Sequence, residues 1–141
     1  MARQKLFSLT AALGVGGVAA VACAQDAVQW RVEDGGNGHW YAGVQFPSGV
    51  SWTAARAHAQ VRGGDLVSLN TPAEREWVFE AVSSNNVLWT TTLGPWVGGY
   101  QQPNSAEPGG GWMWVDGTTV YSGYQWGPGH PDGNNNCGGP A

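Results

Sequence analysis

The alternation of apolar and polar residues near the start of the chain predicts a short β-hairpin. Residues 29–32 read Gln-Trp-Arg-Val, a pattern typical of a strand with one buried face. Residues 33–38 contain two acidic residues and three glycines and interrupt this pattern, and residues 39–44 resume extended character. We therefore predict two strands joined by a turn in the glycine-rich segment.

A first amphipathic helix is predicted over residues 52–62. Ser51 is a good N-cap, because its hydroxyl can accept a hydrogen bond from a free N–H group of the first turn. Gly63 and Gly64 follow the predicted helix and favour its termination, since glycine adopts the left-handed conformation without strain. The residues expected to share the buried face are Trp52, Ala55 and Ala59.

A second helix is predicted to run from Pro72 to about Val82, after a short strand over residues 65–69. Thr71 and Glu74 have the spacing of a capping box, and Pro72 occupies the first helical position, where its missing N–H group has no cost. Glu74 is therefore interpreted as structural rather than catalytic. The residues expected to be buried on this helix are Trp77, Val78, Ala81 and Val82.

The pattern changes after the second helix, where strands and loops are predicted. Residues 96–97 are expected to form a core strand, and residues 101–111, rich in Pro, Gly, Asn and Ser, an exposed loop. A strand containing Trp112 and Trp114, a turn at Asp116-Gly117, and a further strand containing Tyr121 are expected next.

Three short segments in this half of the chain carry a family resemblance. They read Trp-Val-Gly-Gly at residues 96–99, Gly-Trp-Met-Trp-Val-Asp-Gly at residues 111–117 and Trp-Gly-Pro-Gly-His-Pro-Asp at residues 126–132. Together with the two helices, they resemble the core and the ligand loop of a C-type lectin-like domain. The resemblance covers residues 52–132 and implies an α+β fold, in which two helices flank small antiparallel sheets with a long loop region.

The sequence also departs from the family pattern. Family members often carry a cysteine seven residues after the tryptophan that starts the first helix, and Ala59 stands at that position. The resemblance therefore implies a divergent, bacterial-type member without the long disulfide. The family's Trp-Asn-Asp strand does not appear before Ala141, so we expect the last strand to be missing and the apolar faces of Trp96 and Trp114 to be exposed.

The first 24 residues have the features of a signal peptide. Arg3 and Lys5 precede an uncharged, apolar run over residues 6–22, and Ala22-Cys23-Ala24 fits the small-x-small rule for cleavage. A membrane anchor is the alternative, although 17 residues is short for a span that needs about 20. Cys23 could also be a lipoprotein cysteine. We expect residues 25–141 to form one domain that is secreted or displayed at the cell surface, without membrane insertion after cleavage.

The net charge of residues 25–141 limits which classes of partner are expected. Four arginines against ten acidic residues leave residues 25–141 with a net charge of −6 and no lysine. Such a chain has no basic patch for phosphates, which disfavours nucleic acid and anionic lipid as partners. Glycans or surface proteins are the expected partners. Cys137 is the single cysteine of this part, so it is either free or paired beyond Ala141.

The resemblance places the candidate site in the loop over residues 125–136. In sugar-binding family members a Gln-Pro-Asp or Glu-Pro-Asn tripeptide, with its proline in the cis isomer, supplies ligands shared by one calcium ion and two sugar hydroxyls. His130-Pro131-Asp132 stands in that slot. Asp132 matches the third position, whereas His130 does not match the first, because imidazole nitrogen suits zinc or copper better than calcium.

Further candidates surround this tripeptide. Asn134 and its two asparagine neighbours can offer amide oxygens, or they can simply form a turn. Tyr121, Tyr124 and Trp126 are candidates for stacking on sugar C–H faces. The expected carbohydrate contacts are Trp126, His130, Asp132 and Asn134, and the expected calcium ligands are Asp132 and Asn134.

The sequence also disfavours an enzymatic function, because it lacks common catalytic motifs. The sequence has neither the paired spacing of a zinc site nor a Gly-x-Ser-x-Gly elbow. We therefore predict an exported, non-catalytic carbohydrate-binding module, calcium-dependent in its complete form. The alternative is a calcium-independent domain for protein adhesion or surface scaffolding.

Overall fold

A computed structural model describes residues 23, 24, 26–83, 88, 89 and 94–131. The strands in this part are β1 (Cys23–Ala24), β2 (Val28–Gln29), β3 (Trp40–Tyr41), β4 (Val44–Gln45), β5 (Gly99–Gln101) and β6 (Trp112–Trp114). The helices are α1 (Trp52–Val61) and α2 (Pro72–Val78), with a 3-10 turn η1 (Val32–Asp34) and a π-helical turn η2 (Phe79–Ser83).

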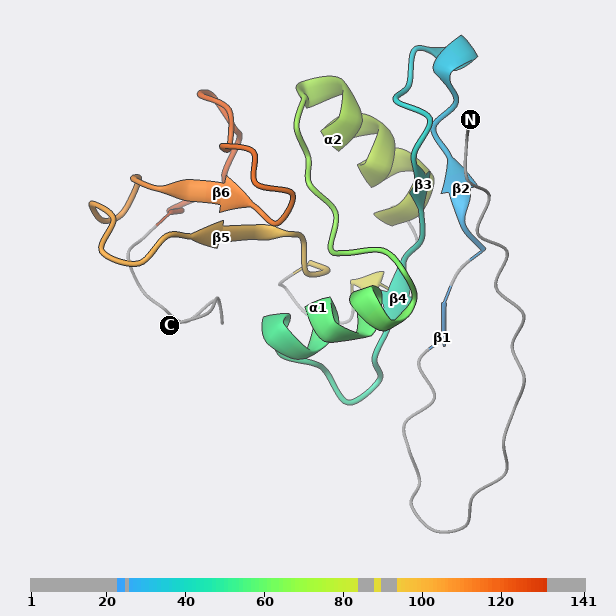
Figure 1. The fold of residues 1–141 in the computed structure, drawn as a ribbon, viewed down its shortest axis with the longest axis horizontal. Coiled ribbons are helices and arrows are strands. Elements are labelled where there is room, and N and C mark those ends of the chain that lie inside the picture. Colours follow the sequence, from blue (N-terminus) through green and yellow to red (C-terminus); the bar gives the residue numbers. More distant parts are fainter. Residues whose placement is uncertain (1–22, 25, 84–87, 90–93, 132–141) are drawn as a thin grey trace, which may run out of the picture.

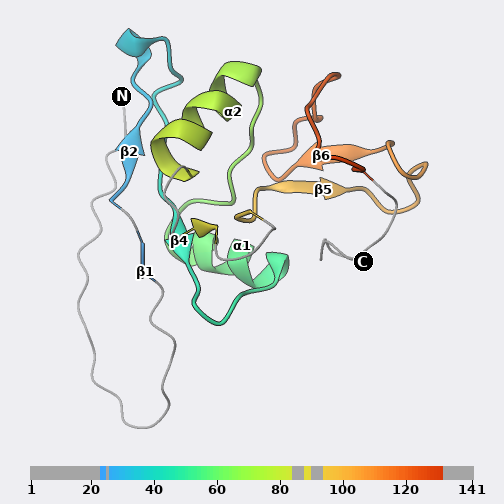
Figure 2. The same cartoon turned by 180° about the vertical axis from the view of Figure 1, so that it is seen from behind.

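The strands form three two-stranded antiparallel sheets, which pair β1 with β4, β2 with β3, and β5 with β6. Helix α2 lies between the β2–β3 hairpin and the β5–β6 hairpin, and α1 packs at one end of this arrangement (Figures 1 and 2). Two helices accompanied by small antiparallel sheets confirm the predicted α+β class. Among the described helices, none is long and apolar enough to span a bilayer.

The first hairpin is confirmed, but its strands are shorter than predicted. The expected strand over residues 29–32 gives way at Val32 to the turn η1, in which the Gly35 N–H group donates to Val32 O. Gly36 is the reason for the early turn, because a Cβ atom there would lie 2.5 Å from the Trp30 ring. The chain therefore folds back over the Trp30 ring, and a longer strand would separate Gly36 from that ring.

Helix α1 matches its prediction closely. The Ser51 hydroxyl accepts a hydrogen bond from the Ala54 N–H group at 3.3 Å, and the helix ends before Gly63, which has a φ of 82°. Of the predicted face, Trp52 and Ala55 are buried and Ala59 is half-buried. The apolar spacing thus identified the side of the helix that packs against the rest of the domain.

Helix α2 begins as predicted and changes form before its end. The Thr71 hydroxyl accepts from the Glu74 N–H group at 3.1 Å, which confirms the N-cap. Beyond Val78 the backbone widens into η2, so helical structure reaches Ser83. Val78 and Val82 are buried as predicted, and Trp77 is half-buried. Ala81 is exposed, contrary to the prediction, because the wider turn changes the direction in which the later side chains point.

Three predicted strands are not strands. They are residues 65–69, residues 96–97 and the segment that contains Tyr121, where the described residues form only an isolated bridge, between Met113 and Thr119. Residues 65–69 run beside residues 96–98, where the Gly98 N–H group donates to Val67 O at 2.8 Å, but no strand forms there. The Asp65 carboxylate accepts the Leu66 N–H group at 2.8 Å, which removes that donor from any ladder. Pairing begins instead at Gly99, where the chain meets Trp114 of β6.

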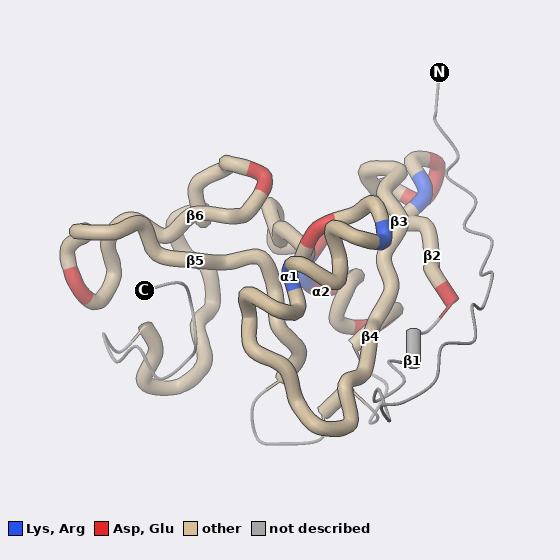
Figure 3. The backbone as a smooth tube through the Cα atoms, turned by 60° about the horizontal axis from the view of Figure 1, so that its bottom comes forward, with Lys and Arg blue, Asp and Glu red and all other residues tan. Residues whose placement is uncertain are grey.

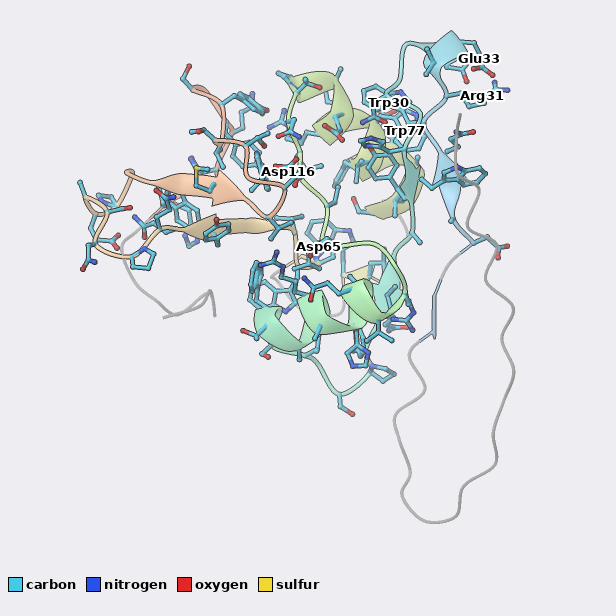
Figure 4. The ribbon with its side chains drawn as sticks, in the orientation of Figure 1. Trp30, Arg31, Glu33, Asp65, Trp77 and Asp116 are labelled. Atoms are coloured by element: carbon cyan, nitrogen blue, oxygen red, sulfur yellow. The ribbon has the colours of Figure 1, made fainter. Side chains whose placement is uncertain are left out.

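The core is built around aromatic residues from distant parts of the chain. Trp30 stacks on Trp77 with ring centroids 5.7 Å apart, and Tyr41 packs against Trp77 at 5.4 Å (Figure 4). The remaining buried members of this cluster are Leu69, Val78, Val82 and Trp114. The N-terminal hairpin, α2 and β6 therefore share one core.

Trp114 is the most deeply buried large side chain, with 1% of its surface exposed. The expectation that its apolar face is exposed is wrong, because the Tyr124 ring covers it edge-on at 5.5 Å. Trp96 is half-buried, and its indole N–H group donates to Val50 O at 2.7 Å. The segment after β6 thus provides the cover that a further strand was expected to provide.

Candidate functional site

A chain of four contacting aromatic rings extends from the core to the surface on the β6 side of the molecule. Tyr124 packs against Trp114 at 5.5 Å and against Trp126 at 5.0 Å. Trp126 in turn contacts Trp112 of β6, with ring centroids 4.7 Å apart. Each ring is held by its neighbours, so the outermost rings have fixed positions.

These rings border an open hollow of about 370 Å³. Its aromatic lining consists of Trp112, Tyr121, Tyr124 and Trp126, and the rest of the lining consists of small residues from 109–111 and 119–123. The four rings are half-buried. Burial raises the pKa of Tyr124, and the nearby Tyr121 adds to that shift. The Tyr124 phenol therefore remains protonated at neutral pH.

The backbone around the hollow is shaped by tight turns. Gly111, before β6, has a φ of 68°, and a Cβ atom there would overlap the Ser105 hydroxyl. Gly123, with a φ of 87°, allows the Tyr124 N–H group to reach Tyr121 O at 3.2 Å. These two glycines let the loop before β6 and the loop after it close around one space.

The turn after β6 is fixed by Asp116. Its carboxylate accepts hydrogen bonds from the Thr118 hydroxyl at 2.6 Å and from the Asn70 amide at 2.8 Å. Burial disfavours ionisation of Asp116, but hydrogen bonds from Thr118, Asn70 and Ser68 outweigh it and lower the pKa of the carboxyl. Asp116 lies beside the segment that leads into α2, so the turn anchors the hollow to the helical half (Figure 4).

A second anchor holds the loop that follows the hollow. The Arg75 guanidinium of α2 donates to the Gln125 side-chain oxygen at 2.9 Å. Gln125 directly precedes Trp126, so this bond fixes the chain where it leaves the aromatic rings. Asn70, which precedes α2, and Arg75 of α2 therefore hold the two ends of the segment that forms the outer wall of the hollow.

The predicted site residues have different outcomes. Trp126 lies in the wall of the hollow. His130 is exposed and is outside that lining, although its N–H group donates to Gly127 O at 3.0 Å, and the peptide bond to Pro131 is cis. Asp132 and Asn134 lie outside the described residues.

Sequence reasoning missed part of this site. Tyr121 and Tyr124 were recognised as candidates, but Trp112 was interpreted only as a residue of a strand, and the glycines of 109–111 as part of an exposed loop. The recurrence of aromatic residues at 121, 124 and 126 was a usable signal. The sequence did not indicate which other segment contacts those rings, because Trp112 is brought next to them only by the tertiary fold.

The donor set in the described part of the chain does not fit calcium. No group of three His, Cys, Asp or Glu side chains comes together among the described residues. The tripeptide residue that is described, His130, offers nitrogen, whereas calcium takes six to eight oxygen ligands. No calcium geometry follows from these residues.

Comparisons with known proteins place this arrangement in a family context. Over 106 residues, or 74% of its length, the chain is 33% identical to C-type lectin domain family 10 member A of Homo sapiens. Over this length the chain resembles a C-type lectin-like domain, and its two helices with small antiparallel sheets are consistent with that fold. It is also 30% identical over 94 residues to a perlucin-like protein of Mytilus galloprovincialis and 28% identical over 106 residues to asialoglycoprotein receptor 2 of Mus musculus.

The lectin-like domain corresponds to only a part of these relatives. The chain spans 28% of the human protein, 29% of the mouse receptor and 56% of the mussel protein. No family model matches the chain, and no solved structure matches it either. The names of two of these relatives describe a lectin-domain protein and a receptor.

Proposed function

We propose that this C-type lectin-like domain binds carbohydrate at the surface formed by the aromatic hollow and the loop that follows it. The observation that carries the proposal is the ring cluster around Trp126, which borders a hollow of about 370 Å³. Exposed aromatic faces with hydroxyl groups beside them are suited to a ligand that is apolar on one side and polar at its rim. Asp132 and Asn134 are proposed as additional contacts from the same loop.

We expect calcium to contribute little to carbohydrate binding. Of the family's ligand residues, Asp132 is matched, Asn134 offers one amide oxygen, and His130 is mismatched. With so few oxygens a bound ion would keep most of its water, so we expect weak calcium binding. Thermal melts with and without millimolar Ca²⁺ test this, because a ligand that binds only the folded state raises the melting temperature.

We also propose where the domain is located. The predicted leader over residues 1–24 implies that the domain is secreted or held at the cell surface, where glycans or surface proteins are its partners. Strand β1 (Cys23–Ala24) lies within this leader and pairs with β4, so its removal would leave β4 without that partner.

A calcium-independent adhesion domain is the second candidate. It is favoured by the N-terminal hairpin, where the Trp40 side chain is 62% exposed and Val32 is 68% exposed. Exposed apolar side chains of this size are typical of protein contact surfaces when they occur together. In this reading the hairpin, rather than the hollow, carries the interaction.

Isothermal titration with lactose, cellobiose and chitobiose separates the two candidates. Carbohydrate binding predicts saturable heat that is lost in Trp126→Ala and retained in Trp40→Ala. Each variant is first melted, so that a loss of fold is distinguished from a loss of ligand. If none of the sugars, nor any glycan on a broad array, binds the folded protein, the carbohydrate proposal is wrong.

A further inference from the structure

The wall of the aromatic hollow contains no charged side chain. Its four rings are accompanied by glycine, serine, threonine and valine, so none of the lining residues carries a carboxylate, an ammonium or a guanidinium group. A lining of this kind recognises a ligand by shape, by ring contacts and by neutral hydrogen bonds. The composition of the wall therefore limits the chemical class of the occupant.

The surroundings extend this argument to acidic ligands. No lysine or arginine follows Arg75 in the sequence, and the β5–β6 side of the molecule shows acidic positions but no basic ones (Figure 3). Arg75, the nearest guanidinium, donates to Gln125 at 2.9 Å and lies 3.9 Å from the Glu76 carboxylate. A carboxylated or sulfated sugar would enter the hollow without a free counter-charge, against a net charge of −6 on residues 25–141.

The geometry of the rings favours a flat ligand with C–H groups on one face. Trp112 and Trp126 meet at 54°, and Tyr124 and Trp126 at 65°, so the rings form the sides of a cradle rather than a single plane. The faces of these rings are electron-rich and attract the positive edge of C–H bonds. The Ser122 hydroxyl lies in the same wall, and the Thr119 hydroxyl, which donates to Met113 Sδ at 3.6 Å, can still accept a hydrogen bond from the polar rim of such a ligand.

On these grounds we infer that the hollow binds an uncharged pyranose ring through its C–H face, and that it does so without a metal ion. The inference rests on the proposed carbohydrate binding and specifies its ligand class. A hollow of about 370 Å³ is near the lower end of ligand sites, which span roughly 300–1,000 Å³, and so suits one or two sugar rings. Stacking and neutral hydrogen bonds supply the affinity, whereas calcium supplies none of it.

Gly109 offers a way to block the hollow without disturbing its rings. A Cβ atom at Gly109 would meet no protein atom within 4 Å, and this residue lines the hollow. Gly109→Leu therefore adds a side chain to the ligand's space. Gly64→Leu is the matched control, because Gly64 lies after α1 and a Cβ atom there would meet its nearest neighbour, Ala59 O, only at 4.0 Å.

The experiment is a titration of the intact protein with lactose and cellobiose, and separately with sialyllactose, in EDTA and in millimolar Ca²⁺. Tryptophan fluorescence and calorimetry report binding, and circular dichroism confirms the fold of each variant. We expect a neutral disaccharide to bind equally in both buffers, with affinity reduced at least tenfold in Gly109→Leu and unchanged in Gly64→Leu. Tyr121→Ala should weaken binding about two- to tenfold, the range expected for one aromatic contact.

Three results would overturn the inference. Binding that needs Ca²⁺, is lost in Asp132→Ala and survives Gly109→Leu would move the site to the loop and leave the proposed carbohydrate function intact. Preference for sialyllactose, abolished in Arg75→Gln, would show that a charge selects the ligand. Absence of binding by any sugar to the folded protein would refute both this inference and the proposed function.

Discussion

Tyr41→Phe is the sharpest test of how the N-terminal hairpin is attached to α2. The Tyr41 hydroxyl donates to Glu74 Oε1 at 2.7 Å and accepts from the Asn37 amide at 2.7 Å. Glu74 is only 5% exposed, and its other acceptor contacts are the Asn37 amide at 3.0 Å and the Asn70 N–H group at 2.9 Å. Burial, followed by the bond to Glu74, raises the pKa of Tyr41, so the phenol remains a donor throughout the range in which proteins are stable.

The expected magnitude follows from what the substitution removes and what it leaves. Phenylalanine retains the ring that packs on Trp77 at 5.4 Å, so little apolar contact is lost. One hydrogen bond to a buried carboxylate disappears, and bonds to charged groups contribute about 1.5–3 kcal/mol. Glu74 keeps two donors, which limits the penalty of leaving it underpaired. We expect the free energy of unfolding to fall by about 2 kcal/mol.

Urea unfolding at neutral pH measures this change. The midpoint should fall while the slope with denaturant stays constant, because the surface exposed on unfolding is the same. Tyr100→Phe is the matched control, since the hydroxyl of Tyr100 makes no hydrogen bond with the described residues. A loss below about 0.5 kcal/mol for Tyr41→Phe, or an equal loss in the control, would show that the buried carboxylate does not hold the hairpin to the helix.

Three further predictions address other parts of the chain. Thr71→Ala removes the N-cap of α2 and should cost about 1 kcal/mol of unfolding free energy in the same urea assay, and an unchanged midpoint would contradict the capping role. Folding lowers the pKa of Asp116, so the ionised carboxylate stabilises the fold fully above its unfolded pKa, and this stabilisation is lost as the pH falls through its folded pKa. The difference in melting temperature between the native protein and Asp116→Asn should therefore shrink in acid. A difference that is independent of pH would refute this prediction. Expression with a C-terminal tag in an exporting host should give a mature mass that starts near Gln25, whereas a retained Met1 would exclude the predicted leader.

Local signals were sufficient wherever a structure depends on near neighbours. The caps at Ser51 and Thr71 and the glycine that follows α1 were read correctly, because each acts through atoms within a few residues. The same holds for the turn between β2 and β3, where Gly35 and Gly38 adopt positive φ angles that other residues rarely adopt. The predicted role of Glu74 was correct in kind, yet its partner Tyr41 is 33 residues away and was not foreseen.

The strand predictions failed for the opposite reason. Residues 65–69 and 96–97 have the composition of strands, but a strand exists only where a partner accepts its hydrogen bonds, and here the Gly98 N–H group donates to Val67 O without a strand forming. Pairing begins at Gly99 because β6 comes alongside at that point. Apolar composition identified segments that are close to the core, and the fold decided which of them are paired.

The sequence by itself determined the two helices, the helix caps, the α+β class and the family resemblance, since these depend on local spacing and short motifs. It also indicated Trp126 as a candidate site residue. Only the tertiary structure decided that Trp112 and Tyr121, from separate segments, border one hollow with Trp126, and that Tyr124 covers Trp114. The physical reason is that a hollow forms only where packing brings separate segments of the chain together. The periodicity of apolar residues along the chain indicates which side chains point inward, but not which side chains they contact.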